Sequence, residues 1–447
     1  MPLALAALLL AACGTETTSP TGTSESSATA AASVEPSQAA TIGPVEPAPG
    51  SDSEVYAPNP EAIVVAIDPG HGGCLDWGVA DPSQRGVELA EKTLTLEIAR
   101  ILRDRLETEG VTVVMVRDDD VALAGDDYPD LGCEGPPWRD VNGDGEAGFD
   151  EEGATRTRDE LQARLDVANL AQADVFVSIH INSPFDGGQT IEIAFSETFY
   201  TDETPWGADF TERLARGVQD GVVSELGAVA DYERGDRGIT AHNFYLVAPP
   251  LFEPTEERPD PVKQPTRGAL MPTILSEVGS ITLRAEHDLL ASPPGQEAVA
   301  DGIFGGLAAF FAERAAAARI GMEEMAIGVP PTPIEGDGPP YWAWHAPDGP
   351  WRIRVTNTGN EPIAAGSRIV AGWEATNGPY LYLPPAERVE IGEPLPALAP
   401  GESVVVVATL PDPAATGRSV AWISLGTGSS TLADLGSPAL QLAREAP

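Results

Sequence analysis

The sequence predicts an α/β domain that is followed by a smaller all-β domain. Between residues 61 and 320, apolar runs of strand length alternate with amphipathic runs of helix length, as in an α/β sheet. Beyond residue 340, short alternating runs are separated by turns rich in Asn, Gly and Pro, which is typical of a β-sandwich. Residues 14–60 and 321–340 have the composition of linkers.

The elements of the first domain follow from apolar runs and from the turn residues that separate them. The predicted order is a strand at 62–67, a helix at about 89–102, a strand at 111–116, a helix ending near 171, a strand at 175–180, a strand at 190–195, a helix near 204–221, strands at 244–248 and 273–278, and a helix at 296–313.

The amino terminus indicates export. Residues 3–12 are small or apolar and would span only about 15 Å as a helix, about half of the hydrocarbon core of a bilayer. They fit the apolar region of a secretion signal, and the segment ending in Cys13 is similar to the lipobox of bacterial lipoproteins, whose Cys is lipidated. The absence of Lys or Arg before the run departs from that pattern. A plain signal peptide is the alternative. We expect a membrane-anchored lipoprotein or a cell-wall protein, with residues 14–60 as its tether.

The net charge limits the partners. The chain has 26 Lys and Arg against 69 Asp and Glu, a formal charge of −43, and its only lysines are Lys92 and Lys263. Such a chain repels nucleic-acid phosphates, so no nucleic-acid partner is expected. The acidity indicates either a solvated exterior surface or specific cation binding.

Four residues of the first domain form a candidate hydrolytic site. Among the five histidines of the chain, His71 and His180 lie at the carboxyl ends of predicted strands, where α/β sheets build their sites, and Glu91 lies near a helix start. Two histidines and one carboxylate leave a fourth position open on a catalytic zinc. Such a site also needs a carboxylate that moves protons, and Glu277 ends an apolar strand.

Four segments resemble, in order and spacing, the zinc-dependent N-acetylmuramoyl-L-alanine amidases of the amidase_3 family. They are IDPGHGG at 67–73, EKTL at 91–94, SIHINS at 178–183 and PTILSEVG at 272–279. The resemblance implies a mixed sheet with helices on both faces, zinc ligands His71, Glu91 and His180, and Glu277 as catalytic acid/base. It also implies the substrate, which is the amide between the lactyl group of N-acetylmuramic acid and L-alanine in peptidoglycan. Two alternatives are an inactive wall-binding lipoprotein and a zinc peptidase acting on stem peptides.

Other residues near these segments are weaker candidates. We expect Asp68 and Asn182 to orient loops by hydrogen bonds rather than to bind metal, with Asn182 as a candidate substrate-binding residue. His242 follows Asp236-Arg237-Gly238 in a region that the family uses near its substrate groove, so it is a second candidate. His287 is expected at the surface.

An acidic insertion interrupts the domain at residues 118–155. Within it, residues 140–151 fit the calcium-loop pattern D-x-N-x-D-G-x5-E, which wraps oxygen ligands around the ion. The candidate ligands are Asp140, Asn142, Asp144, Glu146 and Glu151. The alternative is a solvated acidic loop with chance spacing.

The remaining cysteines form a candidate disulfide. If Cys13 is lipidated, Cys74 and Cys133 can pair outside the cell and would hold the acidic insertion beside the predicted metal-binding turn. Two buried free thiols are the alternative.

The second domain is predicted at residues 341–447. Its strands are expected at 351–355, 367–373, 403–410 and 420–425, in an immunoglobulin-like sandwich of about 110 residues. The sequence does not determine the oligomeric state, and a monomer is expected.

Overall fold

The structure of this chain is a computed structural model. It describes residues 62–73, 76–79, 89–125, 140–141, 156–186, 189–204, 208–248, 268–329, 333–334, 341–342, 344–375, 387–413, 417–427 and 430–446. The predicted signal, the tether, Cys74 and Cys133 lie outside these residues, as does the candidate calcium loop apart from Asp140 and Val141. Within the described part of the chain, no helix is both long and apolar enough to cross a membrane.

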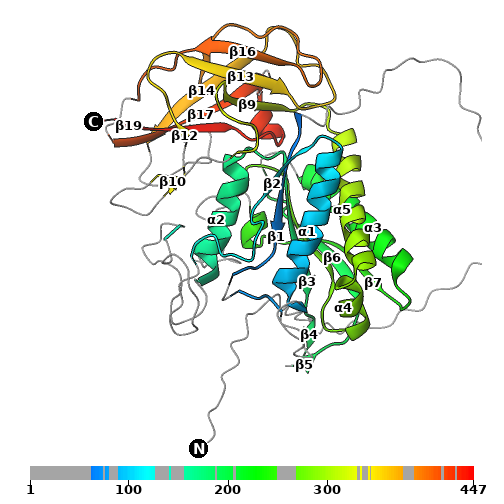
Figure 1. The fold of residues 1–447 in the computed structure, drawn as a ribbon. Coiled ribbons are helices and arrows are strands. Elements are labelled where there is room, and N and C mark those ends of the chain that lie inside the picture. Colours follow the sequence, from blue (N-terminus) through cyan, green and yellow to red (C-terminus); the bar gives the residue numbers. More distant parts are fainter. Residues whose placement is uncertain are drawn as a thin grey trace, which may run out of the picture. The chain divides into compact units, whose positions relative to one another are not determined.

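The first domain is built on a mixed six-stranded sheet of order β2-β1-β3-β8-β6-β7 (Figure 1). Its strands are β1 (Val64–Pro69), β2 (Thr112–Met115), β3 (Val175–Asn182), β6 (Phe195–Tyr200), β7 (Gly235–Ala241) and β8 (Thr273–Ser280). The first four in sheet order are parallel, and β6 runs antiparallel to β8. The predicted mixed sheet is therefore confirmed.

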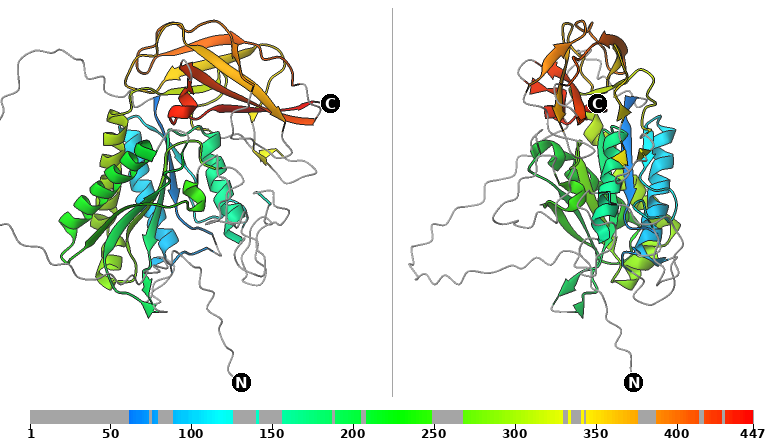
Figure 2. Two further views of the ribbon diagram at one scale, coloured as in Figure 1. Left: turned by 180° about the vertical axis from the view of Figure 1, so that it is seen from behind. Right: turned by 90° about the vertical axis from the view of Figure 1, so that its left-hand side faces the viewer.

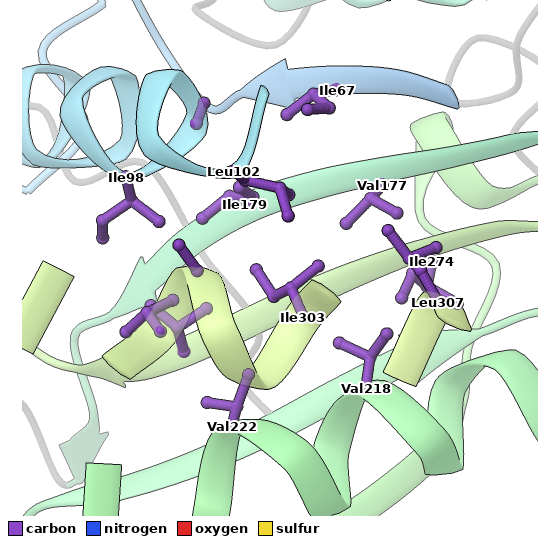
Figure 3. Close-up of a cluster of buried hydrophobic side chains, with 14 of the residues drawn as sticks. Ile67, Ile98, Leu102, Val177, Ile179, Val218, Val222, Ile274, Ile303 and Leu307 are labelled. Carbon is purple, nitrogen blue, oxygen red and sulfur yellow. The ribbon is translucent and has the colours of Figure 1, made fainter. Parts of the chain in front are cut away.

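Helices cover both faces of this sheet. They are α1 (Glu91–Thr108), α2 (Arg156–Leu170), α3 (Ala208–Val229), α4 (Arg284–Leu290) and α5 (Pro293–Ala312). Helices α1, α3 and α5 share one apolar core with the sheet, in which Ile98, Val222 and Ile303 face strand residues such as Ile179 (Figure 3). On the other face of the sheet lies α2 (Figure 2). It packs against the strand residues that point to that face, such as Val64 and Ala66. This alternation places odd and even residues of β1 in different cores.

Two predicted strands of this domain are wrong. The strand expected at 190–195 is observed at Phe195–Tyr200, as β6. The polar residues Ser196 and Thr198 can lie in this buried strand because they form hydrogen bonds with the Val278 carbonyl and with Gln219. The expected strand at 244–248 is the 3-10 turn η4 (Tyr245–Val247), whose apolar residues pack on the sheet instead of joining it. Strand β7 was not predicted, since its polar edge sequence lacks an apolar run.

The second domain consists of two sheets that share one apolar core. The larger sheet has the order β12-β19-β17-β14-β15, with β18 paired to β17, and the smaller has the order β16-β13-β9. The strands are β9 (Ala318–Met322), β12 (Trp344–His345), β13 (Trp351–Asn357), β14 (Arg368–Ala375), β15 (Val389–Ile391), β16 (Ser403–Ala408), β17 (Gly417–Thr427), β18 (Ser430–Thr431) and β19 (Leu440–Ala446). Strands β10 (Pro333–Ile334) and β11 (Tyr341–Trp342) form a separate pair.

The expected boundary at residue 320 falls inside β9, so it is corrected. β9 pairs with β13 along Ala318–Met322 and belongs to the smaller sandwich sheet. The expected linker at 321–340 therefore begins inside a strand. The turn between α5 and β9 is short and mostly alanine, and the sequence offers no composition shift there that would separate the two domains.

A buried ion-pair cluster joins β9 to the first domain. Asp174, directly before β3, accepts a hydrogen bond of 2.6 Å from Arg314 and one from Arg319 of β9. Its second oxygen also accepts from the Val64 backbone at 2.8 Å. Arg319 donates in addition to the Ala62 carbonyl at 2.6 Å. The side chains of Asp174 and Arg314 are each 1% exposed, so this cluster is shielded from water.

Candidate metal centre and active site

Three of the predicted residues meet at the carboxyl end of the sheet. His71 lies in the turn after β1, Glu91 is the first residue of α1, and His180 lies in β3. One oxygen of Glu91, Oε1, is 3.2 Å from His71 Nε2 and 3.2 Å from His180 Nδ1. Glu91 is held there by the backbone amides of Val79 and Ile181, which donate to its two oxygens at 2.9 and 2.8 Å.

The spacing of these atoms fits a small tetrahedral metal ion. Ligand atoms about 2.0–2.1 Å from a tetrahedral zinc lie about 3.3 Å apart. The candidate ligand atoms of His71, Glu91 and His180 all lie within 4.8 Å of one another, and two of the pairs are at 3.2 Å. Two imidazole nitrogens and one carboxylate oxygen are also the donor set of catalytic zinc sites.

Glycines allow the backbone to approach these side chains. A Cβ on Gly70 would lie 2.5 Å from the His180 ring, and one on Gly78 would lie 2.5 Å from Glu91 Oε2. Gly78 also has a φ of +65°, a left-handed conformation that glycine adopts without strain. Gly70 and Gly78 are therefore required by the geometry of the site.

Two buried arginines hold the turn that carries His71. Arg164 of α2 donates to the carbonyls of Pro69 and His71 and pairs with Asp68 at 2.6 Å. Arg117 donates to the carbonyls of Pro69 and Gly70, and burial lowers its pKa to about 10. Asp68 also accepts a hydrogen bond from the Ser178 hydroxyl. It orients the loop indirectly, through its ion pair with Arg164.

Asp76 is a site residue that sequence reasoning missed. Its Oδ1 lies 2.7 Å from His71 Nδ1, so it fixes the ring orientation that turns Nε2 toward Glu91. Burial disfavours the charged ring, but Asp76 and Glu91 outweigh it and raise the pKa of His71 well above its usual value. The signal was an acidic residue five positions after the histidine, within the same glycine-rich turn. The negative charge that favours an imidazolium here also favours a divalent cation.

Glu277 lies beside the three candidate ligands. It is the direct partner of His180 in the β3–β8 pairing and of Glu197 in the β6–β8 pairing, so the three side chains share one face of the sheet. Its Oε2 is buried and has no hydrogen-bond partner among the described residues. Burial, and then the charge of Glu91, raise the pKa of Glu277 well above its usual value, with a further contribution from Glu197. A buried carboxyl with an unused oxygen is suited to holding and releasing a proton.

Glu197 extends this row of side chains and was also missed. It lies at an irregularity of the β6–β7 pairing and accepts a hydrogen bond of 2.9 Å from Thr240. Irregular pairings are common beside active sites because they redirect side chains. The sequence signal was weak, since one glutamate between Ser196 and Thr198 resembles any polar edge residue.

Three further residues were singled out in the sequence: Asn182, His242 and His287. Asn182 is the last residue of β3 and half-buried, on the same face as His180. His242, directly after β7, is exposed, and its ring lies 4.2 Å from Phe244 and 6.3 Å from Phe199. His287 is only 1% exposed, and its Nε2 lies 2.8 Å from the Leu89 carbonyl, so the expectation of a surface position was wrong. It faces inward because α4 packs on β8 and α5.

Comparisons with known proteins identify a family for the first domain. The Amidase_3 family model, described as N-acetylmuramoyl-L-alanine amidase, matches residues 65–309. The germination-specific N-acetylmuramoyl-L-alanine amidase of Bacillus subtilis is 26% identical over 251 residues, which cover 56% of this chain and 81% of that protein. An uncharacterised protein of the same organism is 26% identical over 251 residues, which cover 56% of this chain and 86% of its own.

Solved structures include similar domains. The N-acetylmuramoyl-L-alanine amidase from Clostridium difficile 630 is 26% identical and covers 57% of this chain and 98% of its own, with a TM-score of 0.38. The family model spans His71, Glu91, His180 and Glu277 and more than half of the 447 residues. The chain therefore belongs to the Amidase_3 family of N-acetylmuramoyl-L-alanine amidases, which hydrolyse peptidoglycan.

Proposed function

We propose that this chain is a zinc-dependent amidase that cleaves the bond between the lactyl group of N-acetylmuramic acid and L-alanine of the stem peptide. His71, Glu91 and His180 would hold the zinc, and Glu277 would act as the acid/base. The observation that supports this most directly is the buried Glu277 oxygen, on the strand next to His180, which has no hydrogen-bond partner in the described part of the chain. An inactive wall-binding protein has no use for a buried carboxyl in that position, because an unpaired polar group costs stability.

The residues divide the chemistry between them. Bound zinc would supply Lewis acidity for the attacking water and for the amide carbonyl. Glu277 takes the proton of the water and returns it to the departing alanine nitrogen, so the amine leaves neutral. Asp76 keeps His71 Nε2 turned toward Glu91, while Arg117 and Arg164 keep the turn itself in place.

Digestion of purified peptidoglycan tests the proposal. We expect free muramic lactyl groups and intact stem peptides, identified by mass spectrometry of the new ends. A chelator should abolish the products and added zinc should restore them, because the proposed reaction needs the metal that His71, Glu91 and His180 would hold. Cleavage within stem peptides would support the zinc peptidase instead. No cleavage with zinc present would support the inactive wall-binding protein.

We propose that calcium binds the loop at residues 140–151, through Asp140, Asn142, Asp144, Glu146 and Glu151. The support is the spacing of the oxygen ligands in the sequence. We expect millimolar calcium to raise the melting temperature and to protect the insertion from protease, because an ion that binds only the folded loop stabilises it. Replacing Asp144 by Asn should remove most of that shift. Equal melting temperatures with calcium and with magnesium would contradict a calcium site.

We also propose that Cys13 is lipidated and anchors the protein at the outer face of the cell membrane. The similarity of its surroundings to a lipobox supports this. The tether at 14–60, as a flexible coil, has a root-mean-square span of about 35–40 Å, which lets the catalytic domain reach the surrounding wall. The net charge of −43 argues against a nucleic-acid partner, and we propose that the chain acts as a monomer.

A further inference from the structure

The position of Glu277 sets the direction in which the substrate lies. In the proposed reaction the acid/base delivers a proton to the leaving nitrogen, so that nitrogen must lie within hydrogen-bond reach of Glu277. The candidate metal ligands lie on the β1–β3 side of Glu277, and β6 and β7 lie on its other side. The peptide that departs with the nitrogen therefore extends over β6 and β7, and the sugar lies over the ligand side.

Arg237 occupies the surface over which this peptide would extend. Its guanidinium carbon lies 3.6 Å above the ring of Phe195, and its Nη1 lies 3.7 Å from Glu197 Oε2. Phe195 and Glu197 alternate on β6, so both face the same side of the sheet as Glu277. The Arg237 guanidinium is therefore held on the catalytic face by a ring below it and a carboxylate beside it.

The Arg237 guanidinium is held in place, but it is still exposed to solvent. It is 44% exposed, whereas Arg164 and Arg314 of this domain are 2% and 1% exposed and engaged in ion pairs. The distance of 3.7 Å to Glu197 is beyond that of a hydrogen bond, so within the described part of the chain the planar donors of the guanidinium remain open to another carboxylate. Stacking on Phe195 reduces the entropy that Arg237 would lose on binding one.

The spacing identifies which carboxylate could reach it. β7 is two strands from β8, about 10 Å at about 4.8 Å per strand. An extended peptide advances about 3.3–3.6 Å per residue, so a carboxylate on the second residue lies about 7–10 Å from the scissile nitrogen. The third residue would reach past Arg237, and the first carries its carbonyl in a peptide bond.

Resting on the proposed function, we propose that Arg237 is a specificity-determining residue that binds a free carboxylate on the second residue of the stem peptide. Glu197 and Phe195 position the guanidinium but do not contact the substrate carboxylate. The site would therefore distinguish stem peptides whose second residue carries a free carboxylate from those in which it is amidated.

Two soluble substrates test this proposal. One is N-acetylmuramoyl-L-alanyl-γ-D-glutamyl-L-lysine, and the other is the same compound with the glutamyl α-carboxylate amidated. For the full chain loaded with zinc, we expect a KM about 10-fold or more lower for the free carboxylate, because charge-assisted hydrogen bonds are among the strong ones. Arg237→Ala should raise that KM to the value for the amide, with kcat changed less than about threefold, and Arg237→Lys should restore part of the preference.

Two controls separate this role from a structural one. Arg216→Ala removes another exposed arginine, on α3, which pairs with Glu212 of the same helix, and should leave the preference intact. Affinity measured by calorimetry in the inactive Glu277→Gln protein should fall by the same factor on Arg237→Ala, and only for the free carboxylate.

The outcomes distinguish this proposal from the proposed function. Equal losses with both substrates, or no loss with either, overturn the role of Arg237 while the amidase activity stands. Cleavage of neither substrate nor peptidoglycan by the unmodified protein overturns the proposed function itself.

Discussion

Glu277→Gln should reduce peptidoglycan cleavage by about a thousandfold or more while the protein keeps its zinc. The amide side chain fills the same space but neither accepts a proton from water nor delivers one to the alanine nitrogen, and general acid–base catalysis contributes about 10²–10⁴-fold. The candidate ligands His71, Glu91 and His180 are untouched. Release of soluble muramic fragments measures the activity, and zinc content per chain, measured by elemental analysis, checks the metal.

Glu197→Gln is the matched control for this substitution. It removes a carboxylate one strand away on the same face of the sheet, so it lowers the local negative charge without removing the proposed proton carrier. We expect a loss smaller than about tenfold. Glu277→Gln protein with zinc bound and with activity within tenfold of the unmodified protein would contradict the assignment of the acid/base.

Asp174→Asn should destabilise the folded chain by about 3–5 kcal/mol. Asp174 is the carboxylate between Arg314 and Arg319, and the substitution leaves both guanidinium groups buried without a counter-ion, which is the costly way to break a buried pair. Arg319 belongs to β9, so we expect the sandwich and the catalytic sheet to lose stability together. Urea unfolding followed by fluorescence, with limited proteolysis of each domain, measures the effect.

The exposed pair of Asp348 and Arg444 provides the control. Asp348 is 97% exposed, and Asp348→Asn should cost less than about 1 kcal/mol because water screens the pair. If Asp174→Asn costs no more than this control, the buried cluster does not couple the two domains.

The same cluster predicts sensitivity to acid. Burial alone would raise the pKa of Asp174, but Arg319 and Arg314 outweigh it and lower the pKa below its ordinary value. A group with a lowered pKa contributes stability that is present above its unfolded pKa of about 3.9 and is lost as the pH falls through its folded value. The stability difference between the unmodified protein and Asp174→Asn should therefore be constant near neutral pH and shrink below about pH 4.

Part of the fold could be predicted from the sequence, because some elements are specified by the pattern of their own residues. β1 and β3 are continuous apolar runs buried on both faces, and the sequence predicts them within one or two residues. β6 was predicted too early in the chain and β7 was not predicted, because the stability of both strands comes from their neighbours. Ser196 and Thr198 are satisfied by Val278 and Gln219, which are distant in sequence, so propensity gave no signal.

In the candidate site, too, some residues could be predicted from local sequence patterns and others could not. Its histidines and Glu91 were recognisable because strand ends and helix starts place them at one edge of the sheet. Glu197 and Arg237 were not recognisable as site residues, because their relevance depends on β6 lying next to β8 with one particular register. A shift of one residue would turn Glu197 to the opposite face, and no local pattern specifies that register.

The sequence by itself predicted the α/β class of the first domain, the strand-rich second domain and the four candidate residues of the site. Only the tertiary structure decided three points. Asp76 orients His71, and a buried oxygen of Glu277 has no partner among the residues that the structure describes. β9 pairs with β13 of the sandwich, and Arg319 joins it to Asp174 of the first domain. The physical reason is that strand ends and apolar periodicity are local properties. Hydrogen bonding, desolvation and strand register depend on residues brought together from across the chain.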